Sequence, residues 1–405
     1  MNKSRVLLGA FLAFLVYGDG VKHAQAQNKY DTGATDTEIK IGQTMPYSGP
    51  ASAYGTIGKT EQAFIKMIND QGGIKGRKIN LISLDDAYSP PKTVEQVRKL
   101  VEHDEVLFLW QNLGSAHNSA IHKYVNQKKI PHIFIATGST KFSDPKNFPW
   151  TMSGNTACQT EAQIYARYLL KTKPDAKIAV LYQNDDFGKD LLRGLKDGLG
   201  AKASMIVAEA SYEAADPTVD SQILSLKDAG ADTLFTFATP KFASQTIRKV
   251  YDIGWKPFHF MSYVSQSVTA VLMPAGLEKS VGLITSSNVK DINDPQWANS
   301  SDVKTYQEFM KKYYPGGDPK DSINVYGFIQ ANLLVQTLKQ CGNDLTRENV
   351  MRQAANLKNV ELPMLLPSIK VNTSPTDFFP FEQLQLQKFD GEEWKTFGEM
   401  INLQH

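Results

Sequence analysis

The sequence predicts an α/β protein with two lobes. Its 405 residues correspond to two or three domains at ~150 residues each. From Thr37 onward, short β-rich apolar runs alternate with amphipathic stretches of helical length, which is the pattern of β-α-β units on mostly parallel sheets. A second series of the same kind begins after Pro149-Trp150, so we expect two α/β lobes in tandem.

The elements are assigned from the apolar pattern of each segment. Residues 38–45 form the first expected strand, and the following helix has Ala63, Phe64 and Met67 on one face. Glycines end that helix, and Pro90-Pro91 begins the next. The expected strands are 38–45, 78–85, 106–110, 130–135, 177–182, 203–208 and 233–237. The expected helices are 59–69, 91–102, 115–127, 160–170, 188–199, 220–229, 242–253 and 322–341, followed by a hairpin at 381–397.

Residues 1–26 have the features of a secretory signal peptide. A basic start at Asn2 to Arg5 precedes an apolar run from Val6 to Tyr17, and Ala24-Gln25-Ala26 fits a cleavage site. The apolar run is shorter than the ~20 residues of a membrane-spanning helix, which disfavours the alternative of an N-terminal anchor. We therefore expect a periplasmic protein with no stable membrane insertion.

Charge and motifs exclude several classes of function. Lys and Arg total 44 against 42 Asp and Glu, so the whole-chain charge indicates no nucleic-acid partner. No nucleophile elbow, metalloprotease helix, phosphate loop or paired C-x-x-C occurs, so we expect neither an enzyme nor a cofactor. His117 and His122 lie five positions apart on a predicted helix, a spacing that disfavours a metal site.

The sequence contains two cysteines, Cys158 and Cys341. They are interpreted as two buried thiols, and pairing remains the alternative for an exported protein.

The loops that follow the strands are the candidate ligand site, because ligands of open α/β sheets bind at the carboxyl ends of the strands. Loops 46–55, 111–115 and 136–140 are small and hydroxyl-rich, and they lead into helices. Helix N-termini joined by hydroxyl groups suit a carboxylate or another small anion. The alternative is that Ser115, Ser139 and Thr140 are simple helix caps.

The chain resembles the Leu/Ile/Val-binding family of periplasmic solute-binding proteins. The similarity extends over nearly all of the chain after residue 26. It is carried by Pro46-x-Ser48-Gly49-Pro50-x-x-x-Tyr54-Gly55, Ile68-Asn69-x-x-Gly72-Gly73-Ile74-x-Gly76-Arg77, Asp85-Asp86-x-x-Ser89-Pro90, Ile130-Pro131, Asp186-Phe187-Gly188-Lys189, Gly230-Ala231-Asp232 and Tyr326.

The resemblance implies a type I periplasmic binding protein, with two Rossmann-like lobes joined by three hinge crossings. Lobe I would comprise residues 37–155 and 284–364, and lobe II residues 156–283 and 365–405. It also implies a monomer that traps a small molecule between its lobes and delivers it to the permease of an ABC importer.

The resemblance also implies which residues bind the ligand. Ser115 and the 136–140 loop, with Thr137, Ser139 and Thr140 as candidates, would hold a carboxylate. Tyr54 and Phe187 would enclose an apolar side chain, with ordinary core packing as their alternative. In lobe II the residues themselves, rather than the resemblance, indicate Tyr263, with Ser262 and Gln266, as able to hydrogen-bond a hydroxyl or a carbonyl.

One departure from the family bears on the ligand. Amino-acid binders of this family place a carboxylate after the strand that here is Phe258 to Met261, whereas residues 262–266 contain no acid. An unpaired buried ammonium group would cost several kcal/mol. The prediction is therefore a carboxylate with an apolar, aromatic body, of the benzoate or hydroxycinnamate type. If Asp291 or Asp186 replaces the missing acid, the ligand is a hydrophobic or branched-chain amino acid; a ligand-sensing module for a separate receptor is the second alternative.

Overall fold

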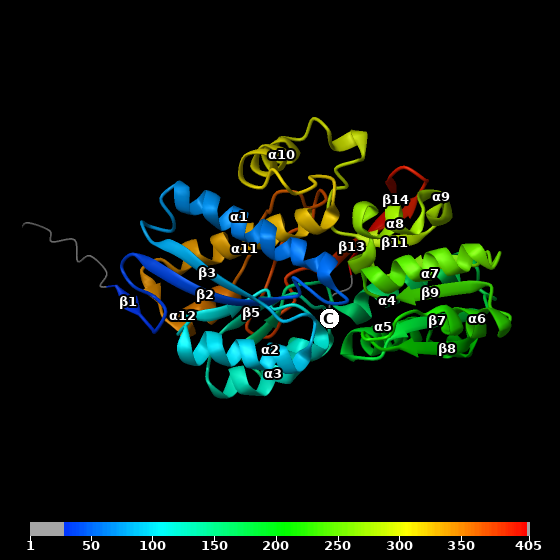
Figure 1. Cartoon of the computed structure of the whole chain (residues 1–405), viewed down its shortest axis with the longest axis horizontal. Helices are drawn as coiled ribbons and strands as arrows, with labels where there is room; N and C mark the ends of the chain where they lie inside the picture. The colour runs from blue at the N-terminus through cyan, green and yellow to red at the C-terminus, as the bar shows by residue number, and fades with distance from the viewer. Residues whose placement is uncertain (1–27, 403–405) are drawn as a thin grey trace, which may run out of the picture.

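The computed structural model describes residues 28–402, so the expected signal peptide lies outside the described residues. The chain forms two α/β lobes side by side, each built on its own sheet (Figure 1). We call the lobe with the five-stranded sheet lobe I and the lobe with the seven-stranded sheet lobe II. The predicted fold class is confirmed.

The sheet of lobe I is wholly parallel, with strand order β3-β2-β4-β5-β6. Its strands are β2 (Glu38–Met45), β3 (Lys78–Asp85), β4 (Phe108–Trp110), β5 (His132–Ile135) and β6 (Thr151–Ser153). Its helices are α1 (Gly55–Asp70), α2 (Pro90–Arg98), α3 (Ser115–Gln127), α10 (Ser301–Tyr313), α11 (Ser322–Cys341) and α12 (Arg347–Ala354). A small ladder pairs β1 (Lys29–Tyr30) with β12 (Asp344–Leu345).

The sheet of lobe II has the order β14-β13-β11-β10-β9-β7-β8. Its pairs are parallel except at the C-terminal hairpin, where β13 is antiparallel to both β11 and β14. Its strands are β7 (Ile178–Gln183), β8 (Ile206–Tyr212), β9 (Thr233–Phe237), β10 (Phe258–Met261), β11 (Ile284–Ser287), β13 (Gln383–Phe389) and β14 (Trp394–Asn402). Its helices are α4 (Cys158–Thr172), α5 (Asp186–Leu199), α6 (Asp220–Asp228), α7 (Pro240–Asp252), α8 (Met273–Ala275) and α9 (Leu277–Ser280).

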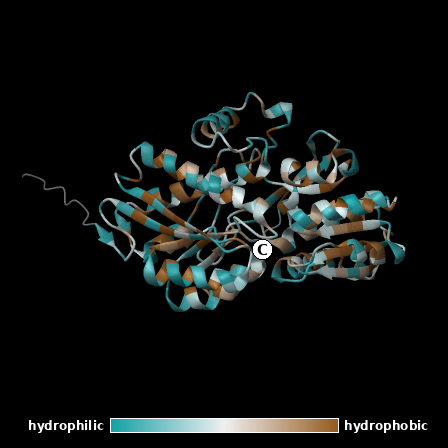
Figure 2. Cartoon of the chain, viewed as in Figure 1, coloured by the Kyte–Doolittle hydropathy of each residue, from teal (hydrophilic) through white to brown (hydrophobic). Residues whose placement is uncertain are grey.

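The central strands are hydrophobic, while the outer faces of the covering helices are largely polar (Figure 2). Helix α11 is an exception, because most of its residues are buried and it lies beside α1. Gly327 allows this close packing: a side chain there would meet the carbonyl oxygen of Ile57 at 3.0 Å. Helix α11 therefore belongs to the core of lobe I rather than to its surface.

The chain passes between the lobes at three places, and two of them differ from the expected boundaries. Ile284 was expected to return the chain to lobe I, yet it pairs with Phe260 and Lys388 in the sheet of lobe II. The return therefore follows Ser287. Leu365 was expected to begin the last part of lobe II, but residues 365–381 pack their apolar side chains into the core of lobe I. The final crossing lies just before β13.

The element prediction missed β6, β11, α10 and α12, and it displaced one strand. The strand expected at 203–208 begins at Ile206, because Gly200 has a positive φ of 56° and a 3-10 helix (Gly200–Met205) follows helix α5. Among residues 28–402, no helix combines the length and the apolar character that a membrane crossing requires.

Candidate ligand-binding site

A cavity of about 110 Å³ lies between the two lobes. Five of the seven predicted ligand-binding residues line it: Tyr54, Ser115, Thr137, Phe187 and Tyr263. The remaining lining residues are Ile57, Tyr88, Leu113, Gly114, Ala136, Gly138, Asn155, Cys158, Thr239, Val264, Gln266, Asn288, Val289, Ser322, Ile323 and Tyr326. Neither Ser139 nor Thr140 lines it.

Lobe I presents the N-terminus of α3 to the cavity. Gly114 precedes this helix with φ of 99°, and no side chain caps its first amide groups. The hydroxyl groups of Ser115 and Thr137 lie 2.6 Å apart in a hydrogen bond. A helix N-terminus carries a partial positive charge and unpaired N–H groups, so this corner suits an anion.

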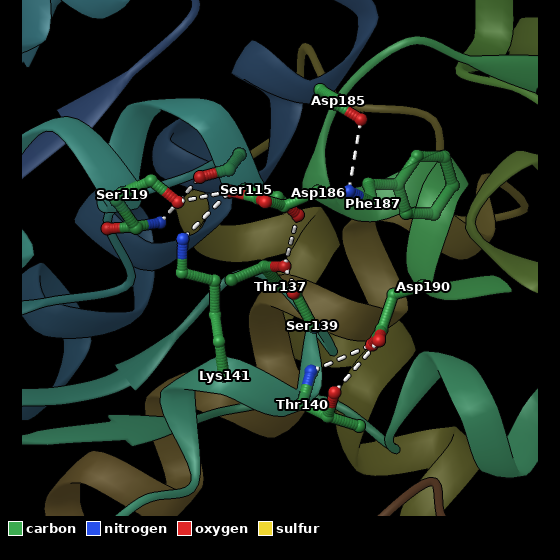
Figure 3. A network of polar contacts seen from close by, with 12 residues as sticks. Ser115, Ser119, Thr137, Ser139, Thr140, Lys141, Asp185, Asp186, Phe187 and Asp190 are labelled. Carbon is green, nitrogen blue, oxygen red and sulfur yellow. Dashed lines mark hydrogen bonds and ion pairs between the residues drawn. The ribbon is translucent and has the colours of Figure 1, made fainter. Parts of the chain in front are cut away.

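Thr140 contacts lobe II instead of the cavity (Figure 3). Its backbone N–H and its hydroxyl each donate to the carboxylate of Asp190 on α5, both at 2.8 Å. Asp190 is only 6% exposed, and Gln159 also donates to it at 2.6 Å. Nearby, Ser119 and Lys141 of lobe I contact the carboxylate of Asp186. These contacts join the lobes outside the cavity.

Lobe II presents aromatic rings. Phe187 stands in the first turn of α5, where the carboxylate of Asp185 accepts the N–H groups of Phe187 and Gly188. Tyr263 begins a 3-10 turn (Tyr263–Ser265) directly after β10. Both rings are about nine-tenths buried. They form an aromatic part of the cavity wall on its lobe II side.

Two hydrogen bonds close the cavity across the lobes. The Tyr54 hydroxyl donates to the carbonyl oxygen of Val264 at 3.0 Å. The side-chain amide of Gln183 donates to the Tyr88 hydroxyl at 3.2 Å. Burial raises the pKa of both tyrosines above the usual range, so both hydroxyls are protonated at neutral pH. The two lobes are thus in a closed arrangement.

No Asp, Glu, Lys or Arg side chain is among the described residues that line the cavity. Of the two candidate replacement acids, Asp186 is bonded to Ser119 and Lys141 as described above. Asp291 accepts the backbone N–H groups of Asn293 and Trp394. Glu161 on α4 lies beneath Tyr263 and accepts its N–H at 2.8 Å, but it does not line the cavity.

Several cavity residues were missed by sequence reasoning. Tyr88 follows β3 with a left-handed backbone conformation (φ of 55°), and no local sequence pattern predicts that conformation. Cys158 and Tyr326 were noted, but neither was assigned to the site. The Tyr326 hydroxyl donates to Asn155 Oδ1 at 2.6 Å and lies 3.1 Å from Gln111 Oε1, so polar contacts hold its ring in place. The signal available was the position of Tyr326 near the start of α11.

Both cysteines are unpaired and buried. Cys158 begins α4 at the cavity, and Cys341 ends α11 in the core of lobe I. Burial raises the pKa of the Cys341 thiol to about 12 and also raises that of Cys158. Both thiols are therefore protonated and inert at neutral pH.

The two histidines of α3 are buried rather than solvated. The ring of His117 lies against Tyr88, with centroids 4.2 Å apart, and that of His122 stacks on Phe148 at 4.0 Å. Burial lowers the pKa of His122 to about 4. Within residues 28–402, no group of three or more His, Cys, Asp or Glu side chains is placed to hold a metal ion.

Comparison with known proteins agrees with this geometry. The family model for periplasmic binding proteins matches residues 38–392. Leu/Ile/Val-binding protein homolog 7 of Brucella abortus (strain 2308) is 22% identical over 315 residues, which cover 75% of this chain and 77% of the relative. The predicted resemblance is confirmed.

Two solved structures share the fold. A branched-chain amino acid ABC transporter protein from Thermus thermophilus with bound valine has a TM-score of 0.82 at 14% identity, covering 91% of this chain and 98% of that one. A solute-binding protein of an ABC transporter from Rhodopseudomonas palustris BisB5, in complex with 3,4-dihydroxybenzoic acid, has a TM-score of 0.75 at 19% identity. The match covers 90% of this chain and 97% of that one.

Proposed function

Because the chain belongs to the periplasmic binding protein family, we propose that it captures a small carboxylate with an aromatic body and delivers it to the permease of an ABC importer. The family consists of binding proteins rather than enzymes. Closure of the lobes around the ligand is the mechanism. Contacts from both lobes give the ligand a higher affinity for the closed state, and this difference shifts the equilibrium.

The observation that carries this proposal is the distribution of charge around the cavity. The uncapped N-terminus of α3, with Ser115 and Thr137, offers donors to a carboxylate. No described acidic side chain lines the cavity to pair with an ammonium group. A ligand with an α-amino group would leave that charge unpaired, at a cost of several kcal/mol.

A hydrophobic amino acid is the second candidate. The relative from Brucella abortus is named for Leu/Ile/Val binding, and the structure from Thermus thermophilus holds valine. In that case the ammonium group would have to be held by neutral oxygens, such as those of Asn155 or Gln266 at the cavity. The protein from Rhodopseudomonas palustris, which holds 3,4-dihydroxybenzoic acid, supports the first candidate.

Thermal unfolding of the purified protein separates the two candidates. The ligands to compare are 3-phenylpropionate and 4-hydroxycinnamate against phenylalanine and leucine, which carry the α-amino group. A ligand at about 100 times its Kd stabilises the folded protein by ~2.7 kcal/mol, which raises Tm visibly. We expect the two amino-free acids to raise Tm, and phenylalanine and leucine to leave it unchanged.

A neutral analogue provides the control. Because 3-phenylpropanamide has the same body as 3-phenylpropionate but no charge, it should give a much smaller shift if α3 binds the carboxylate. A rise in Tm with leucine or phenylalanine alone would reject the aromatic-acid proposal and establish an amino-acid carrier.

A further inference from the structure

A buried carboxylate lies under the turn that forms one wall of the cavity. Glu161 is on α4 and is fully buried. One of its oxygens accepts the Tyr263 N–H at 2.8 Å and the Tyr165 hydroxyl at 2.9 Å. The other accepts the Ser262 hydroxyl at 3.3 Å. Three donors thus converge on this acid, and within residues 28–402 it forms no ion pair.

The turn above Glu161 has two roles in the closed protein. Tyr263 is part of the cavity wall. The carbonyl oxygen of the next residue, Val264, accepts the hydrogen bond of Tyr54 from lobe I. A displacement of this turn would therefore change both the shape of the cavity and the contact between the lobes.

We propose that Glu161 is a positioning residue whose carboxylate fixes the 262–264 turn and thereby sets ligand selectivity at the lobe II end of the cavity. This inference rests on the proposed function, because it assumes that the body of the ligand lies against Tyr263. Glu161 does not touch the ligand in this account; it acts through the backbone of the turn.

The cost of this arrangement supports a specific role. Taking a carboxylate out of water without a cation costs several kcal/mol, and an apolar residue of similar size would avoid that cost. The hydrogen bonds of the turn offset part of it. Glu161 is fully buried, so solvation by water does not offset the rest.

Glu161 is also the group here that titrates near neutral pH. The titratable groups around it are Tyr165 and Cys158 on its own helix, Tyr263 on the turn and Tyr54 from lobe I. Burial raises the pKa of all four above their ordinary values. Burial likewise raises the pKa of Glu161, in its case to about 7. A titration seen at the turn near pH 7 would therefore report on Glu161.

The test compares wild type with Glu161→Leu, which fills the space without an acceptor, and Glu161→Gln, which keeps one acceptor oxygen. The matched control is Glu61→Leu, because Glu61 is an equally buried glutamate on α1 that contacts Gln43 instead of the turn. Hydrogen exchange is measured at the Tyr263 N–H. Loss of one such hydrogen bond should accelerate exchange about tenfold in Glu161→Leu, with little change in Glu161→Gln and Glu61→Leu.

Selectivity is the second readout. The ligands 3-phenylpropionate and 3-(4-hydroxyphenyl)propionate differ only in a hydroxyl group at the end of the ring far from the carboxylate. The ratio of their Kd values therefore reports on the part of the cavity that contacts this end. We expect their ratio to change by about fivefold or more in Glu161→Leu and to return to the wild-type value in Glu161→Gln. Uniform damage to the fold would weaken both ligands equally and leave the ratio unchanged.

A measurement on wild type covers the case in which Glu161→Leu does not fold. The Tyr263 amide resonance should shift with a midpoint near pH 7 in wild type and should show no such shift in Glu161→Gln. A flat Tyr263 resonance in wild type, or wild-type exchange in a folded Glu161→Leu protein, would overturn the proposal. If wild type binds neither acid, the proposed ligand class fails, and the exchange and titration results still decide the role of Glu161.

Discussion

Helices α3 and α5 both begin at the boundary between the lobes, but their N-termini are satisfied differently. Helix α5 in lobe II is capped from within, because the carboxylate of Asp185 accepts the N–H groups of Phe187 and Gly188. Helix α3 in lobe I begins after Gly114, and no side chain caps it. The positive end of α3 therefore remains available to an external anion, whereas that of α5 is already occupied.

The difference shows how one cavity can sort the two ends of a ligand. Under the proposed function, the carboxylate end would bind at the corner formed by Ser115 and Thr137. The apolar body would lie against the rings of Phe187 and Tyr263, since lobe II uses Asp185 and Glu161 to hold its own backbone. Each lobe then contributes a separate part of the selectivity, and variants in each should have separable effects.

The largest predicted effect concerns the acid that lobe II buries. Burial raises the pKa of Glu161 from 4.5 to about 7, so the folded protein holds this proton more tightly than the unfolded chain. Its contribution to stability is therefore greatest below pH 4.5 and is lost as the pH rises to about 7. The loss amounts to roughly 3 kcal/mol at 1.36 kcal/mol per unit.

Urea unfolding of wild type and Glu161→Gln, each at several pH values between 4 and 8, measures this effect. We expect wild type to lose about 3 kcal/mol relative to Glu161→Gln across this range, because the amide does not ionise. Other buried acids, such as Glu61, contribute equally to both proteins and cancel in the difference. A difference that is independent of pH would mean that Glu161 keeps one protonation state throughout.

The second-largest predicted effect concerns ligand affinity and the hydroxyl groups of lobe I at the N-terminus of α3. Ser115→Ala removes one hydroxyl from the uncapped corner, and hydrogen bonds to charged groups contribute about 1.5–3 kcal/mol. The Kd of an acid that raises Tm should therefore increase by roughly 10- to 100-fold, measured by calorimetry. Ser244→Ala is the control, because Ser244 is buried in α7 outside the cavity. Equal affinity in both variants would place the carboxylate elsewhere.

The sequence was sufficient to predict the two-lobe fold and part of the cavity, because the strand pattern and the loops after the strands are local features. Ser115 and Thr137 follow strands directly, and parallel strands bring their exits to one edge of a sheet. Tyr263 also lies shortly after a strand, whereas Tyr54 and Phe187 were assigned from the resemblance to the family. For Ser115, Thr137 and Tyr263 the position along the chain fixes the position in the fold.

The burial of Glu161 and the placement of residues 365–381 depend on tertiary contacts. Glu161 reads as a surface acid on an amphipathic helix, and its burial follows from a turn about one hundred residues later. One signal was present: Tyr165 lies four positions on, so Glu161 shares a face with a buried ring. Residues 365–381 have no regular period, and only their packing assigns them to lobe I.

The smallest predicted effect tests whether exposed charge between the lobes matters beside these buried groups. Lys141 of lobe I and Asp186 of lobe II lie 3.0 Å apart, but their side chains are 42% and 40% exposed. Exposed pairs contribute about 0.2–1 kcal/mol, so Lys141→Met should raise the Kd of the ligand less than about fivefold.

Lys123→Met, on α3 beside the same surface, is the charge-matched control. Calorimetry at low and high salt should show that this small loss disappears with screening. A loss of tenfold or more that persists in salt would mean that closure depends on this pair as much as on the cavity, and the division of labour between α3 and α5 would then be incomplete.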